Sequence, residues 1–287
     1  GNGDGVITTS TGPADVKPWL TDECMAWTLV HAGWDGGQTH GPRGITWTSG
    51  EWNEATCSFI NQKVWLGFSG GSDGHLVRLD GLTGAVEQDL VAPNWNGSNY
   101  APYGGALDKL QRPWFTGLRG ELVRVETGMN PITLSRIPQP GNIQTYGMTV
   151  DPDGNPWMGG CSGPVSTFDV ATSQWISIPG TNACHRGMAV DHNFHVWVAS
   201  NGPCGLVEVD GKTRTLVAQH QLAQCSTPIG VSVDVDGFVW LVDQAGWAWK
   251  IDPDNVPAMQ MIVVPGDHYV YSDMTGGQLK SVAPPQG

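Results

Sequence analysis

YGMTVDPDGNPWMGG, at residues 146–160, is the stretch that decides the fold, because close variants of it return further along the chain. RGMAVDHNFHVWVAS stands at 186–200 and IGVSVDVDGFVWLVD at 229–243. In each variant a tryptophan follows a glycine at an offset of ten residues. A self-similar period of about 40 residues is typical of arrays in which every unit buries its apolar face against a neighbour.

Each repeat contains four short strands. In the unit that begins at Gly147, an alternating strand (147–150) leads through an Asp-Gly turn to a strand around Trp157. Two more strands follow, at 165–169 and 174–178. Four antiparallel strands in about 40 residues describe one blade of a propeller.

The repeats predict an all-β, six-bladed β-propeller of four-stranded antiparallel blades. The anchor glycines are Gly44, Gly104, Gly147, Gly187 and Gly230, and a degenerate sixth unit occupies 268–276, with Tyr269 in the glycine position and Asp273 in the aspartate position. The sixth unit is too short for a blade, while MAWTLVHAG (25–33) resembles the outer strand TLVAQHQL (215–222). We therefore expect the N-terminal strand to complete the last blade and cover its edge. Five or seven blades are the alternatives.

We expect two parts in this chain of 287 residues, an N-terminal extension (1–23) and a single propeller domain (24–287). The net charge of −13 argues against nucleic acid or an anionic membrane as partner. No apolar run approaches the roughly 18 residues of a membrane span. The beginning GNGDG is typical of a mature or trimmed chain without a signal peptide, and we expect a monomer.

The six cysteines form no CxxC pair, which disfavours a zinc ribbon or a thioredoxin-type site. Their even number in a lysine-poor chain predicts disulfides and export, to an extracellular, periplasmic or cell-surface location. Cys161 and Cys184 occupy nearly the same two repeat positions as Cys204 and Cys225. This correspondence predicts the pairs 161–184 and 204–225, and it leaves Cys24 to pair with Cys57.

Most of the conspicuous residues belong to the repeat itself. The five repeat tryptophans are predicted to pack between blades, since they recur at one structural position and bury a large area; they are Trp65, Trp114, Trp157, Trp197 and Trp240. The Asp-Gly turns need no metal ion, because glycine supplies the positive φ that such turns require.

The pattern G-[MV]-x-V-D-x-D-G-x-x-W resembles the virginiamycin B (streptogramin) lyase-like propellers over residues 44–252, and more distantly the NHL-type propellers. The resemblance implies metal-assisted ring opening by elimination, carried out by His and Glu on the face that bears the loops before each first strand. His268 occupies the position of the family's histidine, and His185 lies one residue away from the equivalent position in its own repeat. Asp243 supplies a carboxylate three residues after its repeat tryptophan. These three form the candidate catalytic set, which a Mg²⁺ or Ca²⁺ ion would accompany.

The residue before each anchor glycine varies, and the up-and-down connectivity brings these residues together at one end of the propeller. We expect Arg43, Tyr103, Tyr146 and Arg186 to form a ligand site there, suited to an anionic or hydroxyl-rich molecule. Beside it we place two segments that break the repeat, the insertion 48–60 and the loop 92–103. They contribute Trp52, Trp95 and Asn99. The alternative is that these residues cap the blades and anchor the loop.

The leading hypothesis is an exported binding or interaction module whose ligand is a carbohydrate or an acidic small molecule, with a protein partner as the alternative; a Mg²⁺ or Ca²⁺ ion is the one cofactor considered. A metal-assisted C–O lyase and a structural propeller within a longer surface protein are the alternatives, so the sequence leaves open whether the protein is an enzyme. Motifs of nucleophilic hydrolases, zincins and nucleotide-binding proteins are absent from the sequence.

Overall fold

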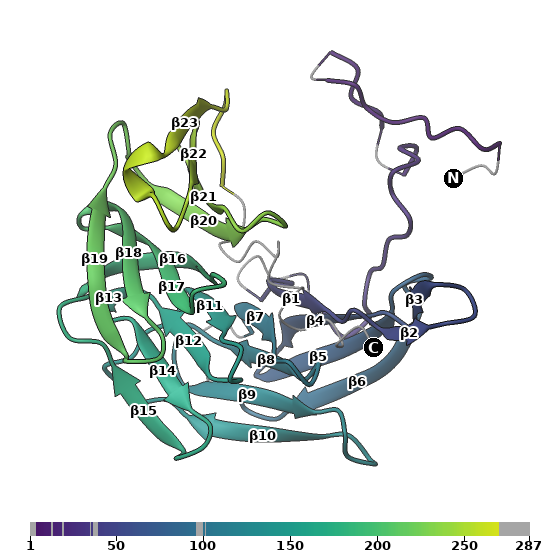
Figure 1. Ribbon diagram of the computed structural model, residues 1–287. Coiled ribbons are helices and arrows are strands. Elements are labelled where there is room, and N and C mark those ends of the chain that lie inside the picture. The colour runs from purple at the N-terminus through teal and green to yellow at the C-terminus, as the bar shows by residue number, and fades with distance from the viewer. Residues whose placement is uncertain are drawn as a thin grey trace.

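The computed structural model describes residues 4–12, 14–18, 20–34, 36, 40–95, 100 and 102–269. Antiparallel sheets from successive chain segments stand around a common axis (Figure 1). First strands of consecutive sheets contact one another, β1 with β7, β7 with β11, β11 with β16 and β16 with β20. The predicted all-β propeller of four-stranded antiparallel blades is therefore confirmed in architecture.

Five blades are present among the described residues. Blade 1 contains β1 (Gly44–Trp47), β4 (Lys63–Gly70), β5 (Asp73–Asp80) and β6 (Val86–Ala92). Blade 2 contains β7 (Gly104–Leu107), β8 (Pro113–Thr116), β9 (Glu121–Glu126) and β10 (Thr133–Pro138). Blade 3 contains β11 (Gly147–Val150), β12 (Pro156–Gly159), β14 (Ser166–Asp169) and β15 (Gln174–Ser177).

Blade 4 contains β16 (Ala183–Val190), β17 (His195–Asn201), β18 (Cys204–Asp210) and β19 (Thr215–Gln221), with the short β13 (Cys161–Gly163) added beside β16. Blade 5 contains β20 (Pro228–Val233), β21 (Val239–Asp243), β22 (Trp247–Ile251) and β23 (Gln260–Val263), with a 3₁₀ turn, η1 (Val256–Ala258), before β23. The insertion between β1 and β4 forms a hairpin of β2 (Glu51–Asn53) and β3 (Ser58–Ile60).

A carboxylate–indole hydrogen bond explains the conserved spacing inside four of the repeats. The aspartate four residues after the anchor glycine accepts a hydrogen bond from the Nε1 of the repeat tryptophan. The distances are 3.3 Å for Asp108–Trp114, 2.9 Å for Asp151–Trp157, 2.7 Å for Asp191–Trp197 and 2.8 Å for Asp234–Trp240. The other carboxylate oxygen accepts backbone N–H groups of the turn, such as that of His195 at 2.9 Å. We call this arrangement the Asp–Trp clamp; blade 1 lacks it, because Thr48 stands in the aspartate position.

Four of the five repeat tryptophans form the core between blades, as predicted. Trp65, Trp114, Trp157 and Trp197 are at most 1% exposed. Trp240 in blade 5 is only half-buried. Close packing also explains an anchor glycine: a Cβ on Gly44 would lie 2.9 Å from Cδ1 of Phe115 in the next blade.

Two of the three predicted disulfides are confirmed, Cys161–Cys184 and Cys204–Cys225. The third prediction is wrong, since Cys24 and Cys57 are both exposed free thiols. Cys24 directly follows the extension, and its backbone N–H donates to the carboxylate of Asp22 at 3.0 Å. Cys57 lies in the turn of the β2–β3 hairpin, and the extension rises away from that hairpin (Figure 1). The two thiols therefore belong to separate local structures.

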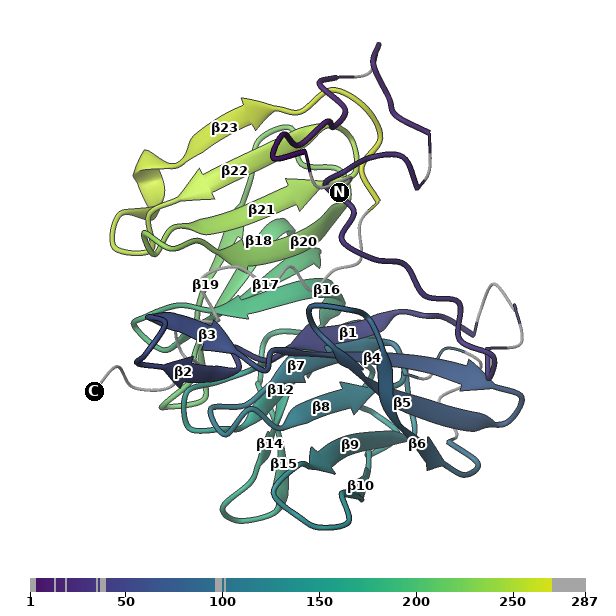
Figure 2. The same cartoon turned by 90° about the vertical axis from the view of Figure 1, so that its right-hand side faces the viewer.

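The segment predicted to complete the last blade packs against the first blade instead. Residues 25–33 form no strand. Trp27, Leu29 and Trp34 lie against the apolar side of blade 1, and Trp27 Nε1 donates to Gly81 O at 3.1 Å. We call residues 24–34 the strap, which runs from the extension to blade 1 (Figure 2). It covers the side of blade 1 against which a further blade would pack, and it contributes no strand to a last blade within the described ranges.

The predicted number of six blades stays a prediction. The degenerate sixth unit (268–276) begins at the end of the described ranges, and Asp273 lies outside them. The boundary between the extension and the propeller near residue 24 likewise stays a prediction. No helix in the described part of the chain is long and apolar enough to cross a bilayer.

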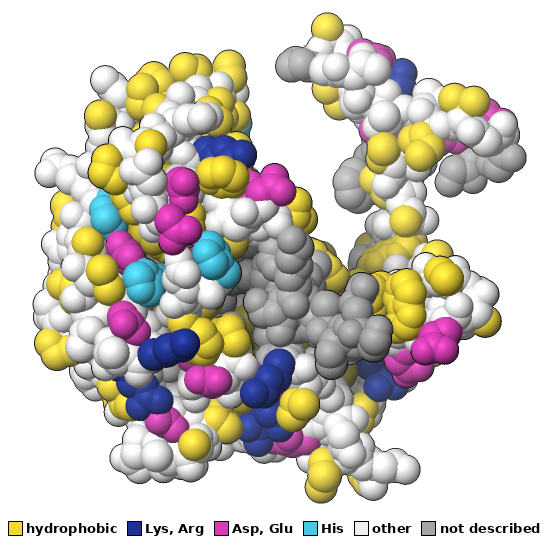
Figure 3. All heavy atoms as spheres, in the orientation of Figure 1, with side chains coloured by type: hydrophobic (Ala, Val, Ile, Leu, Met, Phe, Trp, Pro, Cys, Tyr) yellow, Lys and Arg dark blue, Asp and Glu magenta, His cyan; other side chains and the backbone are white. Residues whose placement is uncertain are grey.

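A buried carboxylate links the three outer strands of blade 4. Glu208 on β18 contacts His195 Nδ1 at 2.5 Å and His220 Nε2 at 2.7 Å, and histidine and acidic side chains intermix on this flank (Figure 3). Burial alone would raise the pKa of Glu208, but the hydrogen bonds from His220 and His195 hold it below its usual value. The carboxylate is therefore kept ionised inside the blade.

We expect Glu208→Gln to destabilise the protein by about 1.5–3 kcal/mol at pH 7, because it removes two hydrogen bonds to a charged group. A carboxyl with a lowered folded-state pKa stabilises the fold above its unfolded pKa near 4.5, and this stability is lost as the pH falls through the folded value. Urea unfolding between pH 3 and pH 7 measures both effects. A variant whose stability falls with acid as steeply as that of the parent would contradict this assignment.

Candidate ligand site at the propeller mouth

Three of the four predicted ligand residues occupy one repeated backbone position. Arg43, Tyr103 and Tyr146 directly precede the anchor glycines of β1, β7 and β11, and each donates its backbone N–H to the second strand of its blade. The acceptors are Gly67 O at 3.2 Å, Thr116 O at 2.6 Å and Gly159 O at 2.7 Å. Arg186, on β16, directly precedes Gly187. The same pairing in blades 1 to 3 places Arg43, Tyr103 and Tyr146 at one end of the propeller, as the connectivity predicts.

The structure brings these side chains together in a row. The Tyr103 and Tyr146 rings lie 5.0 Å apart between centroids. Arg43 Cζ is 5.6 Å from the Tyr103 ring and Arg186 Cζ is 5.8 Å from the Tyr146 ring. Tyr100 extends the row, with its ring 5.2 Å from Arg43 Cζ and 6.1 Å from the Tyr103 ring. We call these five residues the tyrosine–arginine row; a guanidinium stands near each end of three aromatic rings.

The cationic end at blade 4 is partly desolvated and held in place. Burial lowers the pKa of Arg186, while Tyr103 and Asp243 nearby act in the opposite direction. Its Nη1 donates to Asn201 Oδ1, and Asn201 Nδ2 donates to Ser226 O at 3.3 Å. An arginine fixed in this way loses little further freedom when it binds an anion.

A cavity of about 270 Å³ opens beside the row. Its walls include Tyr100, Tyr146, Arg119, Gln144 and Thr145. When the Gln144 amide is oriented to satisfy both of its polar atoms, its oxygen accepts a hydrogen bond from Arg119 Nη2 at 2.9 Å. The cavity therefore combines aromatic faces with a third guanidinium, which suits hydroxyl-rich or anionic ligands.

Three participants were missing from the sequence-based site, whereas a fourth, Tyr100, was expected beside it. Tyr100 lies in the long loop that was predicted to flank the site, three residues before Tyr103. Arg119 lies in the connection after β8, Gln144 lies before β11, and Asn201 is the last residue of β17. These connections share the end of the propeller that the row occupies, but their residue types alone do not distinguish them.

The predicted aromatic flanks of the site lie elsewhere. Trp95 is 5% exposed and belongs to the core of blades 1 and 2, together with Leu76 and Phe115. It packs so closely on Gly74 that a Cβ there would lie 2.6 Å from the Trp95 ring. The loop is thus anchored by its own aromatic, which was the alternative interpretation. Asn99 lies outside the described residues.

Trp52 was placed at the wrong end of the propeller. Its insertion joins the first and second strands of blade 1, and these strands are joined at the end that bears the Asp-Gly turns. Gly50 is bound to Gln111, in the β7–β8 turn, by two hydrogen bonds of 3.3 Å. Trp52 itself is 45% exposed and packs edge-on against Phe59 of its own hairpin.

Two of the three candidate catalytic residues are fully buried. His185 directs Nε2 to Thr181 O at 2.5 Å, and burial lowers the pKa of its ring. Asp243 accepts backbone N–H groups of Ser226, Thr227 and Ala245 at 2.8–2.9 Å. His268 is partly exposed, and its Nε2 lies 2.9 Å from Val264 O. These contacts order loops, and the catalytic assignment stays a prediction.

Metal ligation by residues of the described ranges has little support. One cluster there has the spacing of metal ligands, Cys204, Cys225 and Asp243. Both cysteines are joined in a disulfide, so they cannot offer thiolates. The carboxylate of Asp243 is already bound to three backbone groups, as described above.

No family model and no curated protein sequence matches the chain. Solved structures do match. A virginiamycin B lyase from Staphylococcus aureus, in a catalytically inactive form with quinupristin, is 16% identical with a TM-score of 0.61, covering 80% of this chain and 72% of that one. A streptogramin B lyase structure is 16% identical with a TM-score of 0.60, and the match covers 79% of this chain and 70% of that chain.

A gluconolactonase from Xanthomonas campestris is 16% identical with a TM-score of 0.51, covering 82% of this chain and 80% of that chain. Identities this low establish architecture and not activity. They agree with the repeat pattern, with the antiparallel four-stranded blades and with the resemblance that the sequence carries. The chain has the β-propeller fold of the virginiamycin B (streptogramin) lyases.

Proposed function

We propose that the protein is an exported binding module that captures a carboxylate-bearing carbohydrate, or another acidic small molecule, on its tyrosine–arginine row. The observation that carries this proposal is the convergence of Arg43, Tyr103, Tyr146 and Arg186 beside a cavity. Tyrosine rings offer flat apolar faces with a polar tip, and guanidinium groups bind carboxylates with two parallel hydrogen bonds. The two disulfides support an oxidising, extracytoplasmic location.

Metal-assisted elimination is the second candidate, and the likeness in fold to the streptogramin lyases favours it. It would require His185 and Asp243, which are both 0% exposed, to reach a substrate. Their hydrogen bonds to backbone groups would have to break first, at the cost of leaving those groups unpaired. A binding function needs no such rearrangement, so we favour it.

We expect Arg186→Ala to weaken binding of a uronate-terminated oligosaccharide at least tenfold, because one guanidinium partner of the carboxylate is lost. Tyr146→Ala should weaken it comparably by removing the ring between Tyr103 and Arg186. A glycan array that includes neutral and acidic sugars identifies the ligand, and calorimetry then measures the variants.

Lys212→Ala is the matched control, since it removes an exposed cation in the β18–β19 turn, away from the row. It should bind as the parent does. If Arg186→Ala also keeps full affinity, or if no acidic glycan binds the parent protein, this proposal is wrong.

A further inference from the structure

Blade 1 departs from the other blades at the position that anchors the repeat tryptophan. In blades 2 to 5 an aspartate carboxylate accepts the indole N–H, at the clamp distances of 2.7–3.3 Å. In blade 1 the corresponding residue is Thr48, whose Oγ1 accepts the backbone N–H of Lys63 at 2.9 Å. No acceptor among the described residues is hydrogen-bonded to the indole N–H of Trp65. In blade 1 the indole N–H donor of Trp65 is therefore present, but the aspartate that accepts its hydrogen bond in the other blades is replaced by Thr48.

A cavity of about 340 Å³ lies at this place. Its walls include Thr48, Trp65, Arg78, Asn61, Gln111 and Thr127. This volume is within the range of about 300–1,000 Å³ that is usual for small-molecule sites. The cavity is at the end of the propeller opposite to the tyrosine–arginine row, because Gln111 belongs to the β7–β8 turn.

The guanidinium of Arg78 is a second hydrogen-bond donor that lines this cavity. Arg78 is the cross-strand partner of Trp65, and its Cζ lies 6.0 Å from the Trp65 ring. Its Nε is paired with Glu87 Oε2 at 2.8 Å. The two terminal nitrogens make no hydrogen bond to any described residue, so the end of the guanidinium is available for a bidentate contact. In blade 5 the equivalent residue, Lys250, lies 4.0 Å from the clamp carboxylate of Asp234.

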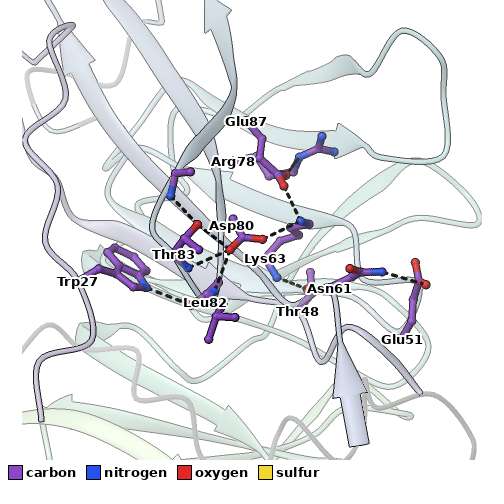
Figure 4. A network of polar contacts seen from close by, with 12 residues as sticks. Trp27, Thr48, Glu51, Asn61, Lys63, Arg78, Asp80, Leu82, Thr83 and Glu87 are labelled. Atoms are coloured by element: carbon purple, nitrogen blue, oxygen red, sulfur yellow. Dashed lines mark hydrogen bonds and ion pairs between the residues drawn. The ribbon is translucent and has the colours of Figure 1, made fainter. Parts of the chain in front are cut away.

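The surrounding polar network holds this geometry in place. Lys63 Nζ lies between Glu87 Oε1 at 2.5 Å and Asp80 Oδ2 at 3.4 Å, with Arg78 beside Glu87 (Figure 4). The Gly50–Gln111 hydrogen bonds tie the insertion to blade 2 and so fix the wall of the cavity. A side chain at Gly50 would collide with the backbone, since its Cβ would lie 2.2 Å from Ile60 O at a φ of +81°. These contacts hold the wall of the cavity against blade 2.

We propose that this cavity is a second binding site, which takes a small carboxylic acid whose carboxylate occupies the place of the repeat aspartate. The carboxylate accepts from Trp65 Nε1 and from the terminal nitrogens of Arg78. In blade 5 the aspartate accepts from the indole in the same way and lies beside a cation, Lys250. The rest of the molecule faces the amides of Asn61 and Gln111 and the hydroxyl of Thr127, which favours a hydroxylated acid. The inference does not rest on the function proposed for the tyrosine–arginine row.

The test follows the indole signals of the tryptophan-labelled protein by ¹H–¹⁵N NMR during titration with acetate, lactate and glucuronate. The Trp65 signal is assigned from a Trp65→Phe variant. We expect a saturable shift of this signal with glucuronate, and none with the neutral methyl glucoside. Since the tyrosine–arginine row contains no tryptophan, this signal reports the cavity alone, and failure here leaves the Arg186 test unaffected.

Thr48→Asp supplies the missing carboxylate from the chain itself, and should weaken glucuronate binding at least tenfold. Thr213→Asp, which adds the same charge in the exposed β18–β19 turn away from the cavity, is the matched control and should bind as the parent does. Arg78→Lys keeps the charge opposite Glu87 but loses the planar fork, and a tenfold loss is again expected. If Thr48→Asp does not fold, the Arg78→Lys variant alone tests whether the cavity binds glucuronate. A Trp65 signal that none of the three acids moves, or undiminished binding in Arg78→Lys, would overturn the proposal.

Discussion

Trp197→Ala is expected to destabilise the protein by about 3–5 kcal/mol, the largest effect of any single substitution considered. The indole is 0% exposed and packs with Leu206, Val231 and Leu241 between blades 4 and 5. Its removal leaves a cavity and also deprives the buried carboxylate of Asp191 of its 2.7 Å hydrogen bond. Denaturant unfolding followed by circular dichroism measures the loss.

Two further variants separate the contributions of packing and hydrogen bonding. Trp197→Phe keeps an aromatic ring but removes the N–H, so it should cost about 1–3 kcal/mol from the unpaired carboxylate alone. Trp52→Ala removes a tryptophan that is 45% exposed on the hairpin, and should change stability by less than about 1 kcal/mol. A Trp197→Ala protein as stable as Trp52→Ala would show that the indole is not an inter-blade core residue.

Removing the apolar side of the strap should have the second largest effect. Trp27→Ala combined with Leu29→Ala is expected to cost about 2 kcal/mol for each half-buried side chain, because both pack on the side of blade 1 that carries Phe68, Val77 and Leu79. The variant should also bind a hydrophobic dye, since this apolar surface becomes exposed to water. Thermal unfolding and dye fluorescence measure the two effects.

The matched control is Val30→Ala, because Val30 lies in the same segment but is 82% exposed. It should leave both measurements unchanged. If the double variant also leaves them unchanged, the strap does not cover blade 1 in solution, and the segment is free to complete the last blade as the sequence predicted.

The strap shows why a pattern of residues can indicate the right surface and the wrong partner. Met25, Trp27, Leu29 and His31 alternate with exposed residues, as in a half-buried strand. The alternation correctly predicts one apolar face, but it does not specify which blade that face meets. Tertiary packing decides this: residues near the start of the chain reach the open side of blade 1 directly.

The same distinction applies to the aromatic residues of the loops. From sequence, Trp95 in a long polar loop is typical of a binding residue, and its burial against Gly74 depends on a contact between distant chain segments. Trp52 differs, because its position between a first and a second strand already implies the end that bears the Asp-Gly turns. The sequence thus contained the information that places Trp52, whereas it contained none that places Trp95.

Predictions from the repeat were correct where the repeat determines the position of the backbone. Arg43, Tyr103 and Tyr146 share a position fixed by one hydrogen bond to the second strand, so their convergence follows from the alignment of repeats alone. Cys161–Cys184 and Cys204–Cys225 follow from it for the same reason. Cys24 and Cys57 lie outside the repeats, and no alignment relates them.

The Asp–Trp clamp has a consequence for the order in which the protein folds. Each clamp joins two residues six positions apart within one hairpin, so it can form before any neighbouring blade has arrived. Local contacts of this kind lose little chain entropy on closing, and proteins rich in local contacts fold faster than those that depend on distant ones. Blades 2 to 5 can therefore begin to fold independently as each emerges. Blade 1, without a clamp, would depend on later contacts and fold after its neighbours.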